Sequence, residues 1–197
     1  MRIIVLLAVV LIQGCAFTTA RLNIAVRPNT DFKGPLSQVA PTKFDVQTLA
    51  DARTDKERIG WKKNTYGMNT ADILSTRPVT DLVSEGIRAG LKQNGHASAM
   101  PGDIVVSGSV TRFWFEVKPN FWTIEFTGNV ECDLRFVRAG QEVYKSRYSG
   151  TYTKKTGGGL EATWTEVMDA SVEKLVEDIV FDANLIEALN KPKLASQ

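Results

Sequence analysis

The chain has 197 residues, enough for one domain with a core of its own and marginal for two. Hydrophobic residues make up 43% of it and charged residues 23%, which is ordinary for a soluble globular protein. The 24 basic and 22 acidic side chains leave a net charge of +2, and so balanced a charge argues against nucleic acid as a partner and against a polybasic membrane-binding patch.

The N-terminus has the features of a secretory signal peptide. Arg2 precedes an unbroken apolar run from Ile3 to Ile12. As a helix, this run would rise about 15 Å, which is roughly half the hydrocarbon thickness of a bilayer and too short to span it. The residues that follow, up to Cys15, resemble the bacterial lipobox, in which the cysteine is lipidated and becomes the first mature residue. The sequence therefore predicts a lipoprotein signal peptide over residues 1–14, and the alternative is an ordinary signal with an incidental cysteine.

Lipidation at Cys15 has consequences for location and for the second cysteine. Attachment to the membrane would rest on N-terminal acyl chains, since more than one chain makes attachment stable. Ala16 follows Cys15, and the lipobox resemblance then implies the outer membrane, with the protein facing the periplasm. If Cys15 carries lipid, Cys132 has no partner in the chain and is expected as a small core residue. A Cys15–Cys132 disulfide is the alternative.

Residues 15–42 are predicted to be a lipidated N-terminus and tether, because prolines and glycine interrupt any helical period. One strand is expected in it, at 22–26, where apolar and polar residues alternate. A second strand is expected over residues 43–50. The dense charged run over 51–58 is typical of an exposed loop. Another short strand is expected at 71–75.

A helix is predicted from Pro78 to just before Gly95. Proline suits a first helical turn, and glycine accepts the left-handed conformation that ends a helix. Gly86 and Gly90 fall on the apolar face, where we expect a close approach to a sheet. The apolar stripe consists of Val79, Leu82, Val83, Ile87 and Leu91.

Three consecutive strands are predicted next, over 104–117, 121–138 and 141–153, joined by short turns. Such an order indicates an antiparallel meander. The second of these strands alternates between apolar and polar residues, which predicts one buried and one solvated face. Its apolar face is expected to hold Trp122, Ile124, Phe126, Val130, Cys132, Leu134 and Phe136.

The last predicted helix covers 163–181, and Thr163 and Glu166 at its start fit the pattern of a capping box. A short final turn is expected beyond Asp182, and residues 191–197 are expected to fray. Together these elements predict one α+β domain over residues 43–190: an antiparallel β-meander sheet with two helices packed on one face.

Catalytic and metal-binding patterns are absent from the sequence. His96 is the only histidine and has no carboxylate in its local sequence, so a triad has no visible third group. One available thiol and one imidazole do not supply a zinc site. The glycines over 157–159 lack the residue order of a phosphate-binding loop. We therefore predict no catalytic residue, no metal and no cofactor.

One aromatic cluster exceeds what a core requires, because rings flank a single predicted turn on both sides. Strand alternation places Trp114 on the face opposite its two neighbours, so both faces of the hairpin tip carry rings. Core filling explains one face only, and exposed aromatics beside a lysine often mark a contact with a partner, lipid or glycan. The alternative is that a helix or the N-terminal segment covers the second face. The candidate contact residues are Phe113, Trp114, Phe115, Lys118, Phe121 and Trp122.

Over about residues 43–190, the chain resembles the YajG-type family of bacterial lipoproteins. The resemblance rests on the run Asp51-Ala-Arg53-Thr-Asp55, on the segment 73–82, on Leu91 with Gly95, and on the order of the elements. It implies an outer-membrane lipoprotein without assigned catalysis, and it provides no active-site residues to transfer. The layout also resembles auxiliary lipoproteins of envelope lipid and lipopolysaccharide transport, which act by docking a partner.

The first hypothesis is thus a non-catalytic, membrane-anchored accessory protein that docks a partner in the cell envelope through the aromatic hairpin. The second is a carrier or sensor of envelope lipid or glycan that uses the same rings as a stacking or hydrophobic platform. A hydrolase is a remote third.

Overall fold

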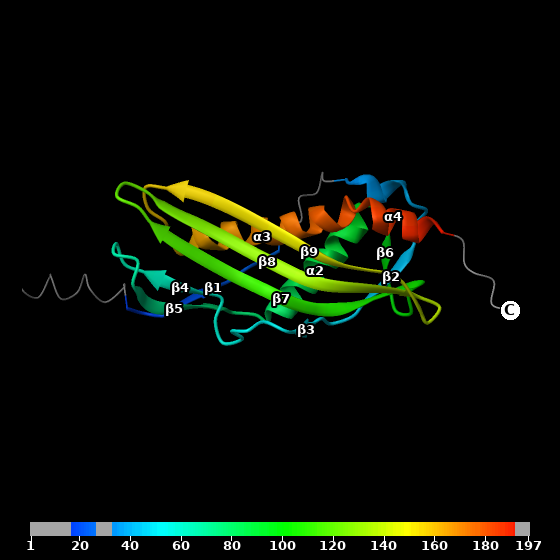
Figure 1. Cartoon of the computed structure of the whole chain (residues 1–197), viewed down its shortest axis with the longest axis horizontal. Helices are drawn as coiled ribbons and strands as arrows, with labels where there is room; N and C mark the ends of the chain where they lie inside the picture. The colour runs from blue at the N-terminus through cyan, green and yellow to red at the C-terminus, as the bar shows by residue number, and fades with distance from the viewer. Residues whose placement is uncertain (1–16, 27–32, 192–197) are drawn as a thin grey trace, which may run out of the picture.

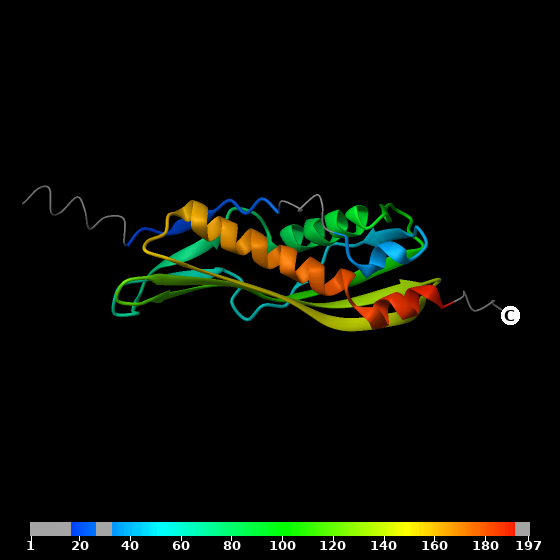
Figure 2. The same ribbon diagram turned by 90° about the horizontal axis from the view of Figure 1, so that it is seen from above.

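Helices cover one face of a large mixed β-sheet in the computed structural model, as the two views in Figures 1 and 2 show. The structure describes residues 17–26 and 33–191. The predicted signal peptide, the lipidation site Cys15 and most of the predicted tail over 191–197 therefore lie outside the described residues. The body is elongated, and strands β7, β8 and β9 run along its length (Figure 1).

The described residues form nine strands, three α-helices and one 3₁₀ helix. The strands are β1 (Ala20–Leu22), β2 (Lys43–Val46), β3 (Ala50–Asp51), β4 (Gly60–Lys63), β5 (Asn69–Ser75), β6 (Ala97–Ser98), β7 (Ile104–Pro119), β8 (Ile124–Arg138) and β9 (Gln141–Thr156). The helices are η2 (Pro35–Gln38), α2 (Val79–Gln93), α3 (Glu161–Val180) and α4 (Ala183–Asn190).

Strand β7 organises the sheet because it is paired along both edges. On one edge it pairs antiparallel with β8, which pairs antiparallel with β9. On the other edge, β2, β3 and β4 follow one another along β7 and all run parallel to it. Strands β5 and β1 then extend the sheet beyond β4. The prediction of a purely antiparallel sheet is therefore wrong, because sequence periodicity alone does not tell which strands become neighbours.

A β-bulge at Thr111 divides β7 into two halves with opposite alternation. The register steps from Val110 opposite Cys132 to Arg112 opposite Glu131, so that Thr111 is an extra residue without a partner on β8. Even-numbered residues point into the core before the bulge, and odd-numbered residues do so after it. The bulge thus decides which rings of the aromatic cluster are buried and which face outward.

Helix α3 lies against the sheet in a seat formed by glycines. A Cβ atom at Gly150 of β9 would lie 2.1 Å from the carbonyl oxygen of Ser171, so no side chain fits between the strand and the helix. On its other side α3 meets α2, where a Cβ at Gly90 would lie 2.2 Å from Val176. The close approach expected at Gly86 and Gly90 is therefore made to another helix and not to the sheet.

The C-terminal helices differ from the prediction in two respects. Helix α3 begins at Glu161, two residues early, and no side chain caps it, while Glu166 binds Lys154 at 2.6 Å instead of forming a capping box. The predicted last turn is a separate helix, α4, so that the described residues form three α-helices and not two. Asp182 caps α4 by accepting hydrogen bonds from two backbone N–H groups at 2.9 and 3.2 Å.

Residues predicted as a tether contribute to the core. Strand β1 pairs parallel with β5, and Ala20, Leu22 and Ile24 are buried. Leu36 and Val39 are buried as well. The folded body therefore starts close to residue 20. No helix in the part of the chain that the structure describes is long and apolar enough to cross a membrane.

Candidate functional site

The rings of the aromatic hairpin fall into three different environments. Phe113 and Phe115 are 1% and 0% exposed, and Phe115 stacks on Phe126 with 5.8 Å between ring centroids. These two rings fill the core under α3 and do not offer a contact surface. Trp114, between them in sequence, is half-buried on the sheet face opposite the helices.

Phe121 and Trp122 form the exposed tip of the same hairpin. Strand β8 begins at Ile124, so Trp122 lies in the turn and is not on the buried face where the sequence predicted it. Phe121 is 88% and Trp122 is 83% exposed, and the two rings meet edge to face at 4.7 Å. Lys118 is exposed at the end of β7 and lies 3.9 Å from Glu116.

A groove lies beside Trp114 because the chain between β3 and β4 leaves the edge of β7 and pairs with it again five residues further along. Strand β3 ends opposite Val110, and β4 begins opposite Phe115. The eight residues 52–59 join these two levels and are more than the gap requires, so they loop outward over the helix-free face. Between this loop and the sheet lies a groove of about 470 Å³ lined by Arg53, Thr54, Asp55, Thr111, Arg112, Phe113, Trp114, Glu131 and Arg147.

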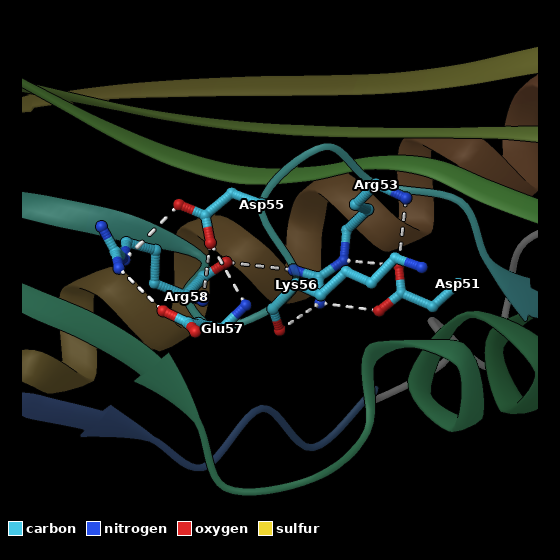
Figure 3. Close-up of polar contacts among 6 residues, drawn as sticks. All are labelled: Asp51, Arg53, Asp55, Lys56, Glu57 and Arg58. Carbon is cyan, nitrogen blue, oxygen red and sulfur yellow. Dashed lines mark hydrogen bonds and ion pairs between the residues drawn. The ribbon is translucent and has the colours of Figure 1, made fainter.

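The loop is held in shape by Arg53, as Figure 3 shows. Its guanidinium donates two hydrogen bonds to the carboxylate of Asp51, at 3.0 and 2.9 Å. It also donates to the carbonyl oxygens of Lys56 and Arg58, both at 3.1 Å. Arg53 is only 8% exposed, so the charged run is not the fully exposed loop that the sequence predicted. One buried guanidinium instead fixes one wall of the groove.

The far end of the loop is fixed by a second set of contacts. Asp55 accepts hydrogen bonds from the backbone N–H groups of Glu57 and Arg58, both at 3.2 Å. The Arg58 side chain lies 3.4 Å from Asp55 and 3.5 Å from Asp72 of β5, and it stacks over the Trp61 ring at 4.3 Å. The loop is thereby preorganised before anything binds to it.

The charges around the groove differ in how strongly they are paired. Arg147 of β9 binds Asp133 through two hydrogen bonds of 2.7 and 3.0 Å, which hold the pKa of the Asp133 carboxyl below its ordinary value. Arg112 lies 3.9 Å from Glu131, which is longer than a hydrogen bond, and its side chain is 50% exposed. Arg112 is therefore the cation of this groove with the most capacity to bind an added carboxylate.

Burial and hydrogen bonding act in opposite directions on Asp51. Burial disfavours its charged form, but the hydrogen bonds from Arg53 outweigh that cost and hold the pKa of Asp51 below its ordinary value. The carboxylate is therefore charged at neutral pH, and the clamp between Asp51 and Arg53 is intact there.

The residues that could support chemistry are engaged elsewhere. His96 is 3% exposed, and its ring lies 3.1 Å from the Leu36 carbonyl oxygen and 3.3 Å from the Thr42 backbone nitrogen. Burial lowers the pKa of His96 and raises the pKa of Cys132 to about 12. Cys132 is a free, buried thiol, as expected for a core residue. Within the described residues, no group of three or more His, Cys, Asp or Glu is placed to hold a metal ion.

Sequence reasoning found Trp114 but not the groove. Phe113, another candidate contact residue, also lines the groove, and the remaining members come from the loop and from three strands. The signal that could have revealed the groove is the loose alternation between Ile104 and Val117, since it marks the bulge at Thr111.

Comparison with known proteins places the chain among lipoproteins. Residues 42–190 match the model of a protein family described as uncharacterized lipoprotein. No curated protein sequence matches the chain. This match supports the coarser part of the predicted resemblance, a lipoprotein family, while the YajG-type assignment stays a prediction.

Two solved structures are similar to the chain at low sequence identity. A protein from Xanthomonas campestris is 13% identical, with a TM-score of 0.53 over 86% of this chain and 96% of that one. PelC from Paraburkholderia phytofirmans, crystallised as a dodecamer, is 14% identical, with a TM-score of 0.40 over 70% of this chain and 88% of its own. The first of these likenesses supports the fold alone.

Proposed function

We propose that this chain, which belongs to the family of uncharacterized lipoproteins, is a non-catalytic lipoprotein of the cell envelope that acts by binding a protein partner in the groove at Trp114. Acyl chains on Cys15 would anchor it in the outer membrane, with the folded body in the periplasm. Tethering to a surface raises the effective concentration of a partner on that surface, so that binding without catalysis is a sufficient function.

The composition of the groove carries this proposal. Tryptophan and arginine are the residues that most often dominate the binding energy of protein interfaces. Here Trp114 lies beside Arg112 in a groove whose opposite wall is fixed by the Arg53 clamp. Because this wall is already ordered, the loop itself loses little conformational entropy when a partner binds.

The same groove indicates what a partner would present. Its volume of about 470 Å³ accommodates a few side chains and not a folded element. An apolar side chain would pack on the Trp114 ring, and a carboxylate would pair with Arg112, which has donors to spare. We therefore expect a loop or an extended segment that combines an apolar residue with an acidic one.

The absence of catalysis is part of the proposal and rests on how two residues are used. The His96 ring is bonded to backbone groups on both sides, and the high pKa of Cys132 keeps its thiol protonated. Neither residue lies in the groove. Threonine hydroxyls and carboxylates do line the groove, but among the described residues no hydrogen bond joins the Thr54 or Thr111 hydroxyl to a carboxylate, as activation by a general base would need.

The proposal is tested by photo-crosslinking in intact cells. A photo-reactive amino acid at position 114 should trap one discrete protein band. Position 145 is the matched control, because the Lys145 side chain is 78% exposed on β9 and does not line the groove. The proposal would be contradicted if position 114 gave no band, or if position 145 gave the same band.

The anchor is tested separately. Cells that express the wild-type chain are grown with radioactive palmitate, beside cells that express Cys15→Ala. The wild-type chain should carry label and the variant should not. An unlabelled wild-type chain, or a variant that takes up as much label, would show that the attachment proposed at Cys15 is wrong.

A glycan is the second candidate for the groove, because polar side chains continue from Trp114 across the sheet. Asn129 lies opposite Trp114 on β8 and accepts a hydrogen bond from Thr151 at 3.2 Å. An aromatic ring beside hydroxyl and amide groups is a suitable stacking surface for a sugar. A carrier of acyl chains is less well supported, since charged residues line both walls. Native mass spectrometry of the purified chain should then show no bound acyl chain other than the anchor.

A further inference from the structure

Exposed apolar side chains gather at one end of the molecule. The described residues include eight large hydrophobic side chains that are exposed, and all but Met100 and Phe181 lie in segments at this end. We call the group the apolar end. Its members are Phe17, Tyr66, Met68, Phe121, Trp122 and Leu160.

Strand pairing shows why these residues come together. Strands β1 and β5 run parallel, so the chain before β1 lies beside the turn that precedes β5. Strands β4 and β7 are also parallel, so the β4–β5 turn and the β7–β8 turn extend in the same direction. Thr156 at the end of β9 pairs with Ile124, which brings the segment before α3 to the same place. Both views of the ribbon agree with this arrangement (Figures 1 and 2).

The apolar end is also where the anchor must attach. Phe17 is two residues beyond Cys15, and two residues span at most about 7 Å even when fully extended. Because β1 is part of the sheet from Ala20, no long tether separates the sheet from the lipidated residue. A cysteine held at the bilayer surface therefore brings this end of the sheet to the headgroups.

We propose that the apolar end docks on the surface of a phospholipid bilayer, with the Phe121 and Trp122 rings inserted at the level of the headgroups. The inference rests on the lipid anchor of the proposed function. Tryptophan is enriched at the boundary between headgroups and hydrocarbon, where its ring is buried and its N–H stays in polar surroundings. The acyl chains supply the attachment, and the rings fix the orientation of the body.

Charge contributes little to this contact. Three lysines near the apolar end lie next to acidic residues: Lys155 is 3.0 Å from Glu125, Lys154 is 2.6 Å from Glu166, and Lys118 is 3.9 Å from Glu116. These pairs neutralise three of the positive charges at this end, so binding should depend only weakly on anionic lipid and on salt. This distinguishes the contact from one made by a polybasic patch.

Docking by the apolar end places the groove at a defined height. Trp114 is five residues from Pro119, the last residue of β7, which corresponds to roughly 17 Å of extended strand. The long axis of the sheet would stand away from the bilayer, and the groove would open sideways into the periplasm. A partner could then reach Trp114 without displacing the membrane contact.

The test measures quenching of tryptophan fluorescence by brominated lipid. The full lipidated chain is reconstituted into vesicles of phosphatidylethanolamine and phosphatidylglycerol, with or without brominated acyl chains. Bromine should lower the emission of the wild-type chain by up to roughly a quarter, the share of one of its four tryptophans. Trp122→Phe should lose this effect and Trp114→Phe should keep it. Phe121→Ser should weaken it, and a salt concentration of about 1 M should leave it nearly unchanged.

Two outcomes would overturn the inference. If the chain floats with the vesicles but bromine does not quench it, or quenches Trp122→Phe as strongly, the anchor stands and the apolar end faces another protein or a second copy of the chain. If the chain does not float with the vesicles, the anchor of the proposed function fails and this inference fails with it. Because Trp122 is 83% exposed, its replacement should not disturb folding.

Discussion

Trp114 and Trp122 belong to one hairpin and are eight residues apart, yet their surroundings have little in common. Trp114 lies in a groove whose wall is fixed by the Arg53 clamp and by the contacts of Arg58. Trp122 projects from a turn and has Phe121 as its ring neighbour. A fixed groove suits a partner with one definite shape, whereas a free-standing pair of rings suits a fluid environment such as lipid. One hairpin can therefore present two kinds of binding surface.

The largest effect on stability is expected at Gly150, where α3 packs closely against the sheet that carries both surfaces. Gly150→Ala would force a Cβ to within 2.1 Å of the Ser171 carbonyl oxygen, and the backbone cannot yield easily. We expect a loss of about 3 kcal/mol in the free energy of unfolding, because overpacking displaces the helix from the strand. Urea unfolding measures it, and Gly157→Ala is the control, since a Cβ added at Gly157 would have no atom within 4 Å. Equal stability of the two variants would contradict the proposed seat.

A substitution of Arg53 should weaken binding in the groove and leave the membrane contact of the tip unchanged. Arg53→Lys keeps the charge but cannot make the forked hydrogen bonds to Asp51, and we expect a loss of about 1–3 kcal/mol in the free energy of unfolding. Crosslinking from position 114 should decline, while the lipid quenching of Trp122 should remain at the wild-type value. Arg135→Lys serves as control, because the Arg135 side chain is 58% exposed and does not line the groove. A parallel decline of both readouts would show that the two surfaces are not independent.

The contribution of the Asp51–Arg53 clamp to stability should depend on pH. The rings of Phe121 and Trp122 do not titrate, so no such dependence is expected from the tip. The pKa of Asp51 is lower in the folded chain than its ordinary value of 3.8, so its contribution to stability is complete above that value. This contribution is lost as the pH falls below 3.8 and through the folded pKa. Asp51→Asn should therefore be less stable than the wild-type chain at about pH 6, and the difference should shrink toward about pH 3. Urea unfolding at both values measures this, and a difference that grows in acid would contradict the assignment.

The smallest change in stability is expected at the tip. Trp122→Ser should alter the free energy of unfolding by less than about 0.5 kcal/mol, because the side chain is already in solvent. Trp114→Ser should cost more, since its ring is half-buried. Thermal unfolding of the two variants compares them directly. A larger loss at position 122 than at position 114 would contradict the environments described for the two rings.

Local patterns predicted most of the elements but not their neighbours. The apolar stripe after Pro78 and the alternation in β8 located a helix and a strand to within a few residues, because both depend on residues close in sequence. The parallel pairing of β2, β3 and β4 with β7 depends on contacts across more than fifty residues, and no local period encodes it.

The candidate site shows the same limit. Alternation alone places Trp114 on the outer face. The groove, however, is formed by the loop between β3 and β4, which pair with β7 at Val110 and Phe115, and only the parallel register reveals this. The sequence assigns Trp122 to the buried face because it places the end of the turn at Asn120. The structure closes the turn from Asn120 to Thr123, at a hydrogen bond of 2.8 Å, so both rings of the tip fall outside the strand.

The most direct measurement places photo-reactive amino acids at positions 114 and 122 in parallel, in intact cells that express the full chain. We expect a discrete protein adduct from position 114 and an adduct with phospholipid, but no protein band, from position 122. A protein adduct from position 122, or none from position 114, would contradict the assignment of the groove to a partner and of the tip to the membrane.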